Sequence, residues 1–250
     1  MEPTYSSLAS VFRLASWVGG HKTTRYGHHR LEPTGGAVVA INHTSYLDFT
    51  FAGVELRRTD KRFLRFMAKS ELEKNPVIRF LMARTRTISV DRFAPAESYR
   101  VAVQALRDGE LVGVYPEATI NKSFELKEFK TGAARMALEA DVPIVPVIVW
   151  GAQRIITKGQ PAHLGRTKTP VMIASGEPLE PSGDPHELTA RLRAAMNALL
   201  REVQDAYGEH PAGAYWVPAR LGGGAPTLEE AERMAREQAA ERAARKQDGG

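Results

Sequence analysis

The sequence predicts an α/β fold: a largely parallel central sheet flanked by helices, with an amphipathic N-terminal helix and a helical C-terminal tail. Short apolar segments rich in β-branched residues alternate with segments in which apolar residues recur at helical spacing. The most apolar segment, Val142 to Trp150, contains two prolines, which favours a strand over a helix. At 250 residues the chain is long enough to bury one substantial core.

Strands and helices are expected to alternate along the chain. Strands are expected at the short apolar segments 37–41, 63–67, 87–90, 111–115 and 142–150. Helices are expected from about Ser45, at 70–82 with a second start near Pro76, at 97–107 and at 131–140.

Two later helices carry clear start signals. Asp184 as cap, a proline at the next position and Glu187 three residues after the cap predict a helix that ends at Gly208. Residues 221–250 are a glycine-rich linker and a charged helical tail, which Thr227 and the glutamate three residues later begin. Glu and Arg residues spaced four apart fit a solvated helix, and a partner-binding role is the less favoured alternative.

Residues 1–30 form a distinct N-terminal segment. From Tyr5 to Val18 the only charged residue is Arg13, and the apolar residues form a stripe at helical spacing. Basic residues and histidines follow between positions 21 and 30. An apolar helix followed by a basic segment suits a protein that lies on an anionic membrane surface. The alternative, that this helix packs on the protein's own core, is equally open.

Composition excludes some kinds of site and favours others. The chain has no cysteine, which excludes disulfides, thiolate nucleophiles and cysteine metal sites. The formal net charge of +5 and the pI of about 9.5 favour an anionic partner, such as a phospholipid surface, a nucleic acid or a phosphorylated substrate. No apolar stretch is as long as a membrane span and no signal peptide is evident, so a peripheral (monotopic) protein is expected.

The strongest functional signal follows the first apolar strand. His43 comes just after residues 37–41, where open α/β sheets place their chemistry, and Asp48 lies five positions further on. Asp48 could hold one nitrogen of the imidazole and leave the other to take a proton. A structural histidine is the alternative, because Ser45-x-x-Asp48 is also a capping pattern that begins a helix. The pair supplies too few ligands for a metal site.

Four segments together resemble the glycerolipid acyltransferases, in particular the 1-acyl-glycerol-3-phosphate acyltransferase branch. In order they are Asn42-His43-x4-Asp48, Thr-Ile-Ser-Val-Asp-Arg at 87–92, Tyr-Pro-Glu-Ala-Thr at 115–119 and Val-Pro-Ile-Val-Pro-Val at 142–147. One such segment alone is weak, but four in this order are specific. The resemblance implies that residues 31–220 are the acyltransferase domain, between the N-terminal segment and the charged tail.

The resemblance implies direct acyl transfer. His43 would act as the general base on a glycerol hydroxyl, Asp48 would fix its tautomer, and the hydroxyl would attack an acyl thioester without an enzyme nucleophile. The Asn42 side chain, or main-chain amides at the following helix start, would stabilise the oxyanion. The co-substrate would be acyl-CoA or acyl carrier protein, with no cofactor.

In this family the second and third segments hold the acceptor's phosphate. By position, Arg92, Glu117 and Thr119 take these roles here, Lys69 resembles a further phosphate-binding lysine, and Lys130 is a weaker candidate. A phosphomonoester requires cations. The structural alternatives are a surface ion pair for Arg92 and a solvated lysine at position 69.

The chain departs from the family pattern. Ala118 and Ile120 replace the glycine and the arginine of the third segment, and Arg86 stands where the second segment usually begins with glycine, so its cation could be a substitute. Losing the arginine removes a bidentate phosphate ligand, for which Lys122 or Arg92 could compensate. These departures bear on the acceptor and not on the reaction type.

We therefore expect acyl transfer to 1-acyl-glycerol-3-phosphate, giving phosphatidate, at the cytoplasmic face of a membrane. The expected partners are the acyl donor, a lysophospholipid and an anionic membrane surface, and not a nucleic acid. Two alternatives stay open: a same-fold acyltransferase that uses another lysolipid or an amino-acid lipid, and a non-catalytic lipid-binding protein. The His43 and Asp48 pair argues against the second alternative.

Overall fold

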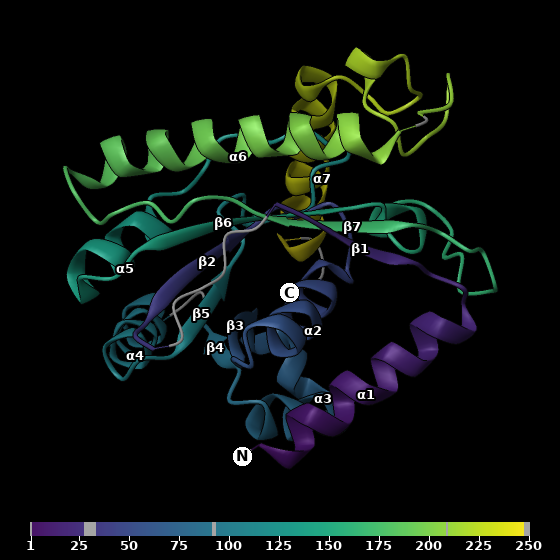
Figure 1. The fold of residues 1–250 in the computed structure, drawn as a ribbon. Helices are drawn as coiled ribbons and strands as arrows, with labels where there is room; N and C mark the ends of the chain where they lie inside the picture. The colour runs from purple at the N-terminus through teal and green to yellow at the C-terminus, as the bar shows by residue number, and fades with distance from the viewer. Residues whose placement is uncertain (1, 28–33, 92–93, 209, 248–250) are drawn as a thin grey trace.

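A seven-stranded, largely parallel sheet forms the centre of the molecule (Figure 1). The computed structural model describes residues 2–27, 34–91, 94–208 and 210–247, with side chains described as far as residue 241. The strand order is β1-β7-β6-β2-β5-β3-β4, and neighbouring strands are parallel except β6 and β7. The strands are β1 (Thr23–Tyr26), β2 (Ala37–Ile41), β3 (Leu64–Lys69), β4 (Ile88–Val90), β5 (Leu111–Val114), β6 (Ile144–Trp150) and β7 (Val171–Ser175). The predicted α/β fold is confirmed.

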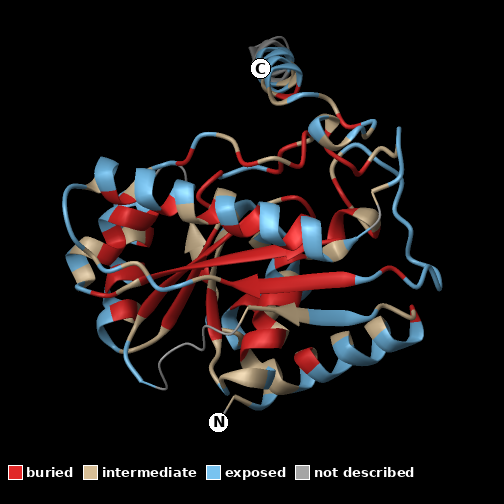
Figure 2. Ribbon diagram, turned by 45° about the horizontal axis from the view of Figure 1, so that its top comes forward, coloured by how far each residue is buried: buried red, intermediate tan, exposed pale blue. Residues whose placement is uncertain are grey.

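Helices cover both faces of the sheet, so its central strands β2, β5 and β6 are buried on both sides (Figure 2). One face packs against α4 (Pro95–Arg107), α5 (Gly132–Ala140) and α6 (Pro185–Tyr207), and the other against α2 (Asp48–Thr59) and α1 (Pro3–Val18). The remaining helices are η1 (Ser70–Lys74), α3 (Pro76–Arg84), η2 (Ala152–Arg154), η3 (Ala219–Leu221) and α7 (Leu228–Gln247). Burial on both faces explains why the central strands read as continuous apolar runs.

Start signals in the sequence correspond to helix starts in the structure. The Asp184 side chain accepts hydrogen bonds from the first turn of α6, and Glu187 bonds back to the Asp184 amide, which completes the predicted capping box. Pro76 is the first residue of α3, as predicted for a second helix start. The strands β1 and β7 were not predicted. Thr23 and Thr24 of β1 are exposed on an edge strand and give no apolar pattern.

Helix α1 has one face in the core and one in solvent. On the inner face Ala9 is buried and Phe12 packs edge-on against Phe51 of α2, with ring centroids 4.9 Å apart. On the outer face four apolar side chains are 59–76% exposed: Val11, Leu14, Trp17 and Val18. The core-packing interpretation therefore holds for the inner face, and the membrane interpretation of the outer face stays a prediction. None of the helices in the described ranges combines the length and apolar character needed to cross a bilayer.

The entry to β2, the strand that leads to His43, depends on a close backbone approach at Gly36. A methyl group at this position would lie 2.0 Å from the Leu106 carbonyl oxygen at the end of α4. We expect Gly36→Ala to lower the free energy of unfolding by about 3 kcal/mol, measured by urea denaturation, because the helix and the strand must separate.

Gly132→Ala is the matched control for this substitution. A methyl group at Gly132, the first residue of α5, would meet no atom within 4 Å. This variant should be unchanged or more stable by up to about 1 kcal/mol, because alanine favours the helix. Equal stability of the two variants would show that the approach at Gly36 is not tight.

Candidate active site

The candidate site lies at the edge of the sheet where the parallel strands β2, β3 and β5 end. His43 follows β2, Lys69 is the last residue of β3, and the β5–α5 loop (residues 115–131) follows β5. The carboxyl ends of neighbouring parallel strands lie side by side, so residues from three separate parts of the sequence meet here. This is the place that the sequence analysis assigned to the chemistry.

His43 and Asp48 form the expected pair. The Nδ1 atom of His43 lies 3.3 Å from Oδ2 of Asp48, and the imidazole is 15% exposed while the carboxylate has no exposure. An ionised carboxylate only accepts hydrogen bonds, so it selects the imidazole tautomer with the proton on Nδ1. Nε2 is then the ring nitrogen that can take a proton from a substrate.

The Asp48 carboxylate also organises the loop between β2 and α2. Its Oδ2 accepts hydrogen bonds from the amides of Thr44 (2.8 Å) and Ser45 (2.7 Å). Burial raises the pKa of Asp48, and the hydrogen bond from His43 and the two loop amides oppose that rise. The capping pattern Ser45-x-x-Asp48 is present in part: Asp48 accepts the Ser45 amide and the Ser45 hydroxyl oxygen accepts the Leu47 amide, although α2 begins only at Asp48. The Ser45 hydroxyl donates to the carbonyl oxygen of Ile156.

Tyr115 completes the support of the imidazole, and the sequence analysis did not single it out. Its ring stacks on His43 with centroids 3.6 Å apart and planes within 8° of parallel. Its hydroxyl accepts a hydrogen bond from the amide of Phe49 in α2. Burial raises the pKa of Tyr115 well above its usual range, so the phenol stays neutral. The stacked ring limits rotation of the histidine away from Asp48.

Glu117 is a buried carboxylate that holds the main chain of the catalytic loop. It accepts hydrogen bonds from the amide of His43 (3.0 Å) and, on its other oxygen, from the amide of Lys127 (3.4 Å). Burial raises the pKa of Glu117 to about 7, and the two amides and the Lys127 charge oppose that rise. In the described structure both Glu117 oxygens therefore serve the protein, which indicates a positioning role.

The Asn42 side chain does not face the site, so the prediction that it stabilises an oxyanion is wrong. Asn42 has no exposure, and its amide group bonds both the carbonyl oxygen (3.0 Å) and the amide (2.7 Å) of Val149 in β6. It closes the ladder between β2 and β6 beyond their last paired residues. Of the alternative donors, the main-chain amides at the start of α2, that of Phe49 donates to the Tyr115 hydroxyl and those of Thr50 and Phe51 donate to the Leu47 carbonyl oxygen.

Two departures from the family pattern lie at positions where the main-chain conformation favours glycine. Arg86 and Ala118 have φ angles of +53° and +60°, in the left-handed region that side chains rarely adopt. The Arg86 guanidinium bonds to Glu110 at 2.7 Å and lies 3.8 Å from Glu2. Both carboxylates also bind the buried Arg65. The idea that Arg86 replaces a phosphate-binding cation is therefore wrong, because its charge is used in this network.

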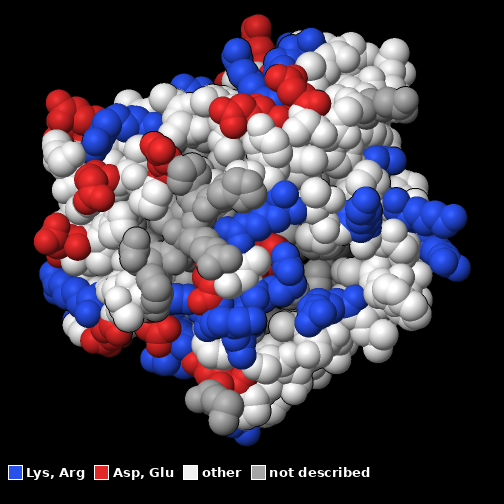
Figure 3. Space-filling model, in the orientation of Figure 1, with Lys and Arg blue, Asp and Glu red and all other residues white. Residues whose placement is uncertain are grey.

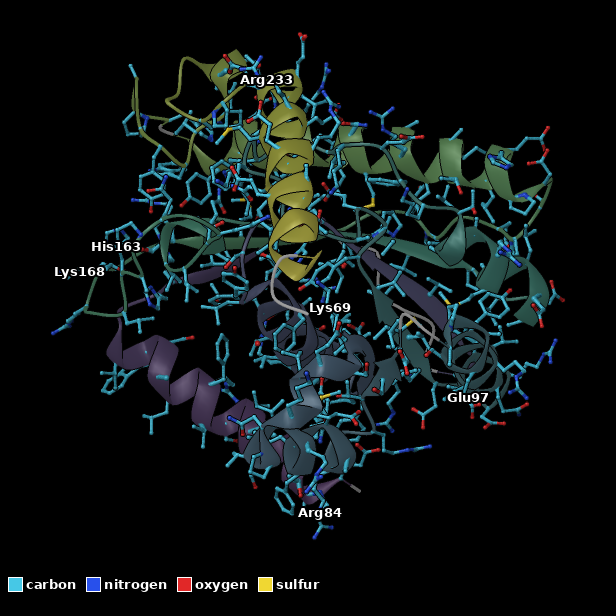
Figure 4. All side chains as sticks on the ribbon, turned by 180° about the vertical axis from the view of Figure 1, so that it is seen from behind. Lys69, Arg84, Glu97, His163, Lys168 and Arg233 are labelled. Atoms are coloured by element: carbon cyan, nitrogen blue, oxygen red, sulfur yellow. The ribbon has the colours of Figure 1, made fainter. Side chains whose placement is uncertain are left out.

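The remaining predicted binding residues differ in their hydrogen-bond partners and in their positions. Thr119 is exposed and its hydroxyl accepts a hydrogen bond from Nζ of Lys127, a lysine that the sequence analysis did not single out. Lys69 is exposed at the end of β3, and in Figure 4 it lies below the C-terminal end of α7. Lys130 is exposed and its amide bonds to the Pro116 carbonyl. Arg92 lies outside the described residues.

The Glu117 carboxyl predicts a pH dependence of stability. Its pKa rises from 4.5 to about 7 on folding, so the folded protein keeps a proton that the unfolded chain loses. This contribution to stability is complete below pH 4.5 and is lost as the pH rises through about 7. Relative to Glu117→Gln, the wild-type free energy of unfolding should fall by about 2–3 kcal/mol between pH 5 and pH 8.

Urea denaturation of both proteins across this pH range measures the difference. The other buried carboxylates, Asp48 and Glu55, are present in both proteins, so their own titration cancels in the comparison. Parallel pH profiles would contradict the elevated pKa of Glu117.

Comparisons with known proteins agree with the fold. A family model described as Acyltransferase matches residues 22–150. A 1-acyl-sn-glycerol-3-phosphate acyltransferase from Bacillus subtilis is 27% identical over 195 residues, which cover 75% of this chain and 89% of the relative. A protein of the same name from Borreliella burgdorferi is 22% identical over 163 residues, 62% of each chain. The crystal structure of a 1-acyl-sn-glycerophosphate acyltransferase from Thermotoga maritima covers 83% of this chain and 81% of its own, with a TM-score of 0.65 and 21% identity, and shows a shared fold.

Proposed function

This chain belongs to the Acyltransferase family, whose model spans residues 22–150, and from that premise we propose that it acylates 1-acyl-glycerol-3-phosphate to give phosphatidate. The acyl donor is a thioester, either acyl-CoA or acyl carrier protein, and no cofactor is required. The relatives named for this reaction support the choice of acceptor. The observation that carries the proposal is the contact of His43 with the buried Asp48 at the end of β2.

In the proposed mechanism, Nε2 of His43 takes the proton of the acceptor's free hydroxyl as its oxygen attacks the thioester carbonyl carbon. Asp48 keeps the other proton on Nδ1 and stabilises the imidazolium that forms. The tetrahedral intermediate then collapses, the carbon–sulfur bond breaks, and the leaving thiolate takes the proton back from Nε2. The products are the new ester and a free thiol, and the enzyme regains its starting protonation state.

An apolar cavity beside the site suits the acyl chain. It has a volume of about 120 Å³ and lies between α1, α2 and β3, with Tyr5, Leu8, Phe49 and Phe66 in its wall. Phe66 packs edge-on against Tyr115 at 5.0 Å, the same ring that stacks on His43. The cavity wall is therefore separated from the base by a single aromatic ring, so a chain bound there could present its carbonyl carbon at the imidazole.

We expect His43→Ala to reduce acyl transfer by at least about 10³-fold, because the general base is lost. The measurement is transfer of a radiolabelled acyl group from acyl-CoA, and separately from acyl carrier protein, to lysophosphatidate. Asp184→Ala, at the cap of α6 and away from the site, is the control and should keep full activity at 25 °C. Residual turnover above one-tenth of wild type in His43→Ala would remove the base from the mechanism.

The acceptor and the acyl chain are lipids, and we propose that the protein meets them at a membrane surface on its cytoplasmic side. The outer face of α1 is apolar, and α3 beside it exposes Val77 (64%) and Phe80 (55%). Figure 3 shows a mostly uncharged surface along α1 with basic side chains at its border. An apolar surface with cations around it fits the acyl and headgroup layers of an anionic bilayer.

We expect the double variant Leu14→Ser, Trp17→Ser to bind anionic vesicles at least about tenfold more weakly, because two side chains that enter the acyl region are lost. These side chains are 60% and 76% exposed, so the fold should be unaffected. Val101→Ser, on α4 and 48% exposed, is the control for a change of the same kind elsewhere. Vesicle co-sedimentation measures binding, and equal binding of all three proteins would exclude α1 as the membrane contact.

A further inference from the structure

A small cavity between the β5–α5 loop and α7 gathers positive charge. Its volume is about 30 Å³, and it is lined by Thr119, Ile120, Asn121, Lys122, Lys127, Lys158, Ala231, Glu232, Met234, Ala235 and Gln238. Three of these residues are lysines and one is a carboxylate, Glu232 of α7.

Each of the three lysines is tied to the loop that carries His43. The amide of Asn121, next to Lys122, donates to the His43 carbonyl oxygen at 3.3 Å. The hydroxyl of Thr157, next to Lys158, donates to the Thr44 carbonyl oxygen at 2.6 Å.

The third lysine reaches the same loop through a carboxylate. The amide of Lys127 bonds to Glu117, which in turn accepts the His43 amide. Two segments, the β5–α5 loop with Lys122 and Lys127 and the segment with Thr157 and Lys158, are thus linked to the histidine loop by hydrogen bonds.

We infer that Lys122, Lys127 and Lys158 bind the phosphate of the acceptor. Before the acceptor binds, the Glu232 carboxylate of α7 takes the place of that phosphate as the counter-charge of these lysines. The inference rests on the proposed function and names the cations that stand in for the arginine missing from position 120. A phosphomonoester carries close to two negative charges at neutral pH, which three lysines can neutralise.

The position of Glu232 and the small size of the cavity both indicate that α7 covers the lysines before the acceptor binds. The Glu232 charge acts on Lys127, whose pKa is lowered by burial and raised again by Glu117 and Glu232. The space between the β5–α5 loop and α7 is about 30 Å³, so a movement of α7 away from the loop would widen the site for a phosphate.

Helix α7 is suited to such a movement. In the part of the helix whose side chains are described, Ala231 is its only buried residue. A helix with little buried apolar surface opens at low cost in free energy. In Figure 4 the helix runs across this face of the molecule, with Arg233 near its upper end, so displacing it uncovers the β5–α5 loop.

Steady-state kinetics of single variants test the three lysines. Lys122→Gln, Lys127→Gln and Lys158→Gln should each raise the KM for lysophosphatidate about tenfold or more, with kcat changed less than threefold. The KM for the acyl donor should not change. Arg100→Gln, an exposed cation on α4, is the control for net charge and should leave both KM values unchanged. Thermal unfolding of each variant checks that the fold is retained.

A second pair of variants tests α7. Glu232→Gln should lower the KM for lysophosphatidate about threefold or more, because the competing carboxylate is gone. Glu237→Gln, on the same helix but exposed and near Arg233, should have no effect. A raised KM in Glu232→Gln would show that this residue supports the site and would overturn its role as an occupant.

The outcomes separate this inference from the proposed function. If the KM for acyl-CoA rises in the lysine variants and that for lysophosphatidate does not, the lysines bind phosphates of the donor and the inference is wrong. Unchanged values for both substrates also overturn it. If the wild-type protein transfers acyl groups to lysophosphatidate from neither donor, the proposed function fails before the variants are compared.

Discussion

The site depends on the burial of the Asp48 carboxylate. A carboxylate without solvent exposure is stable only where hydrogen-bond donors replace its water. The loop after β2 therefore folds so that two main-chain amides and Nδ1 of His43 all point to Oδ2 of this residue. Glu117 does the same from the loop after the neighbouring strand β5 and holds the His43 amide. Ring and main chain of the histidine are thus positioned by separate buried carboxylates before any substrate binds.

Local sequence patterns predicted most of the helices and strands, and the elements that they did not predict depend on tertiary contacts. Strands such as β2 are buried on both faces, so their apolar residues are consecutive and visible in the sequence. The edge strand β1 pairs only with β7 and has no such pattern, because hydrogen bonds of the main chain hold it. The left-handed conformations of Arg86 and Ala118 had an indirect signal, since the family pattern has glycine at both positions.

The site was predictable where its parts are close in sequence. The five-residue spacing of His43 and Asp48 fixed their relation within one loop. Asn42 was misassigned because its partner lies on β6, 107 residues away, and no local pattern shows this bond. Lys127 and Lys158, two cations of the proposed phosphate site, were missed for the same reason, because hydrogen bonds across the fold link their segments to the histidine loop. Sequence patterns found the base, and contacts across the sheet edge were needed to find what surrounds it.

The missing arginine of the third segment changes how a phosphate can be recognised. Ile120 is 8% exposed, so its side chain is part of the cavity wall, and the cations lie on neighbouring segments instead. An arginine recognises phosphate by a planar, bidentate fork, whereas a lysine acts as a point charge on a flexible chain. A site built from lysines gains charge but loses geometric selection. Selection must then come from shape, and α7, which forms one wall of the lysine cavity, is the element that could supply it.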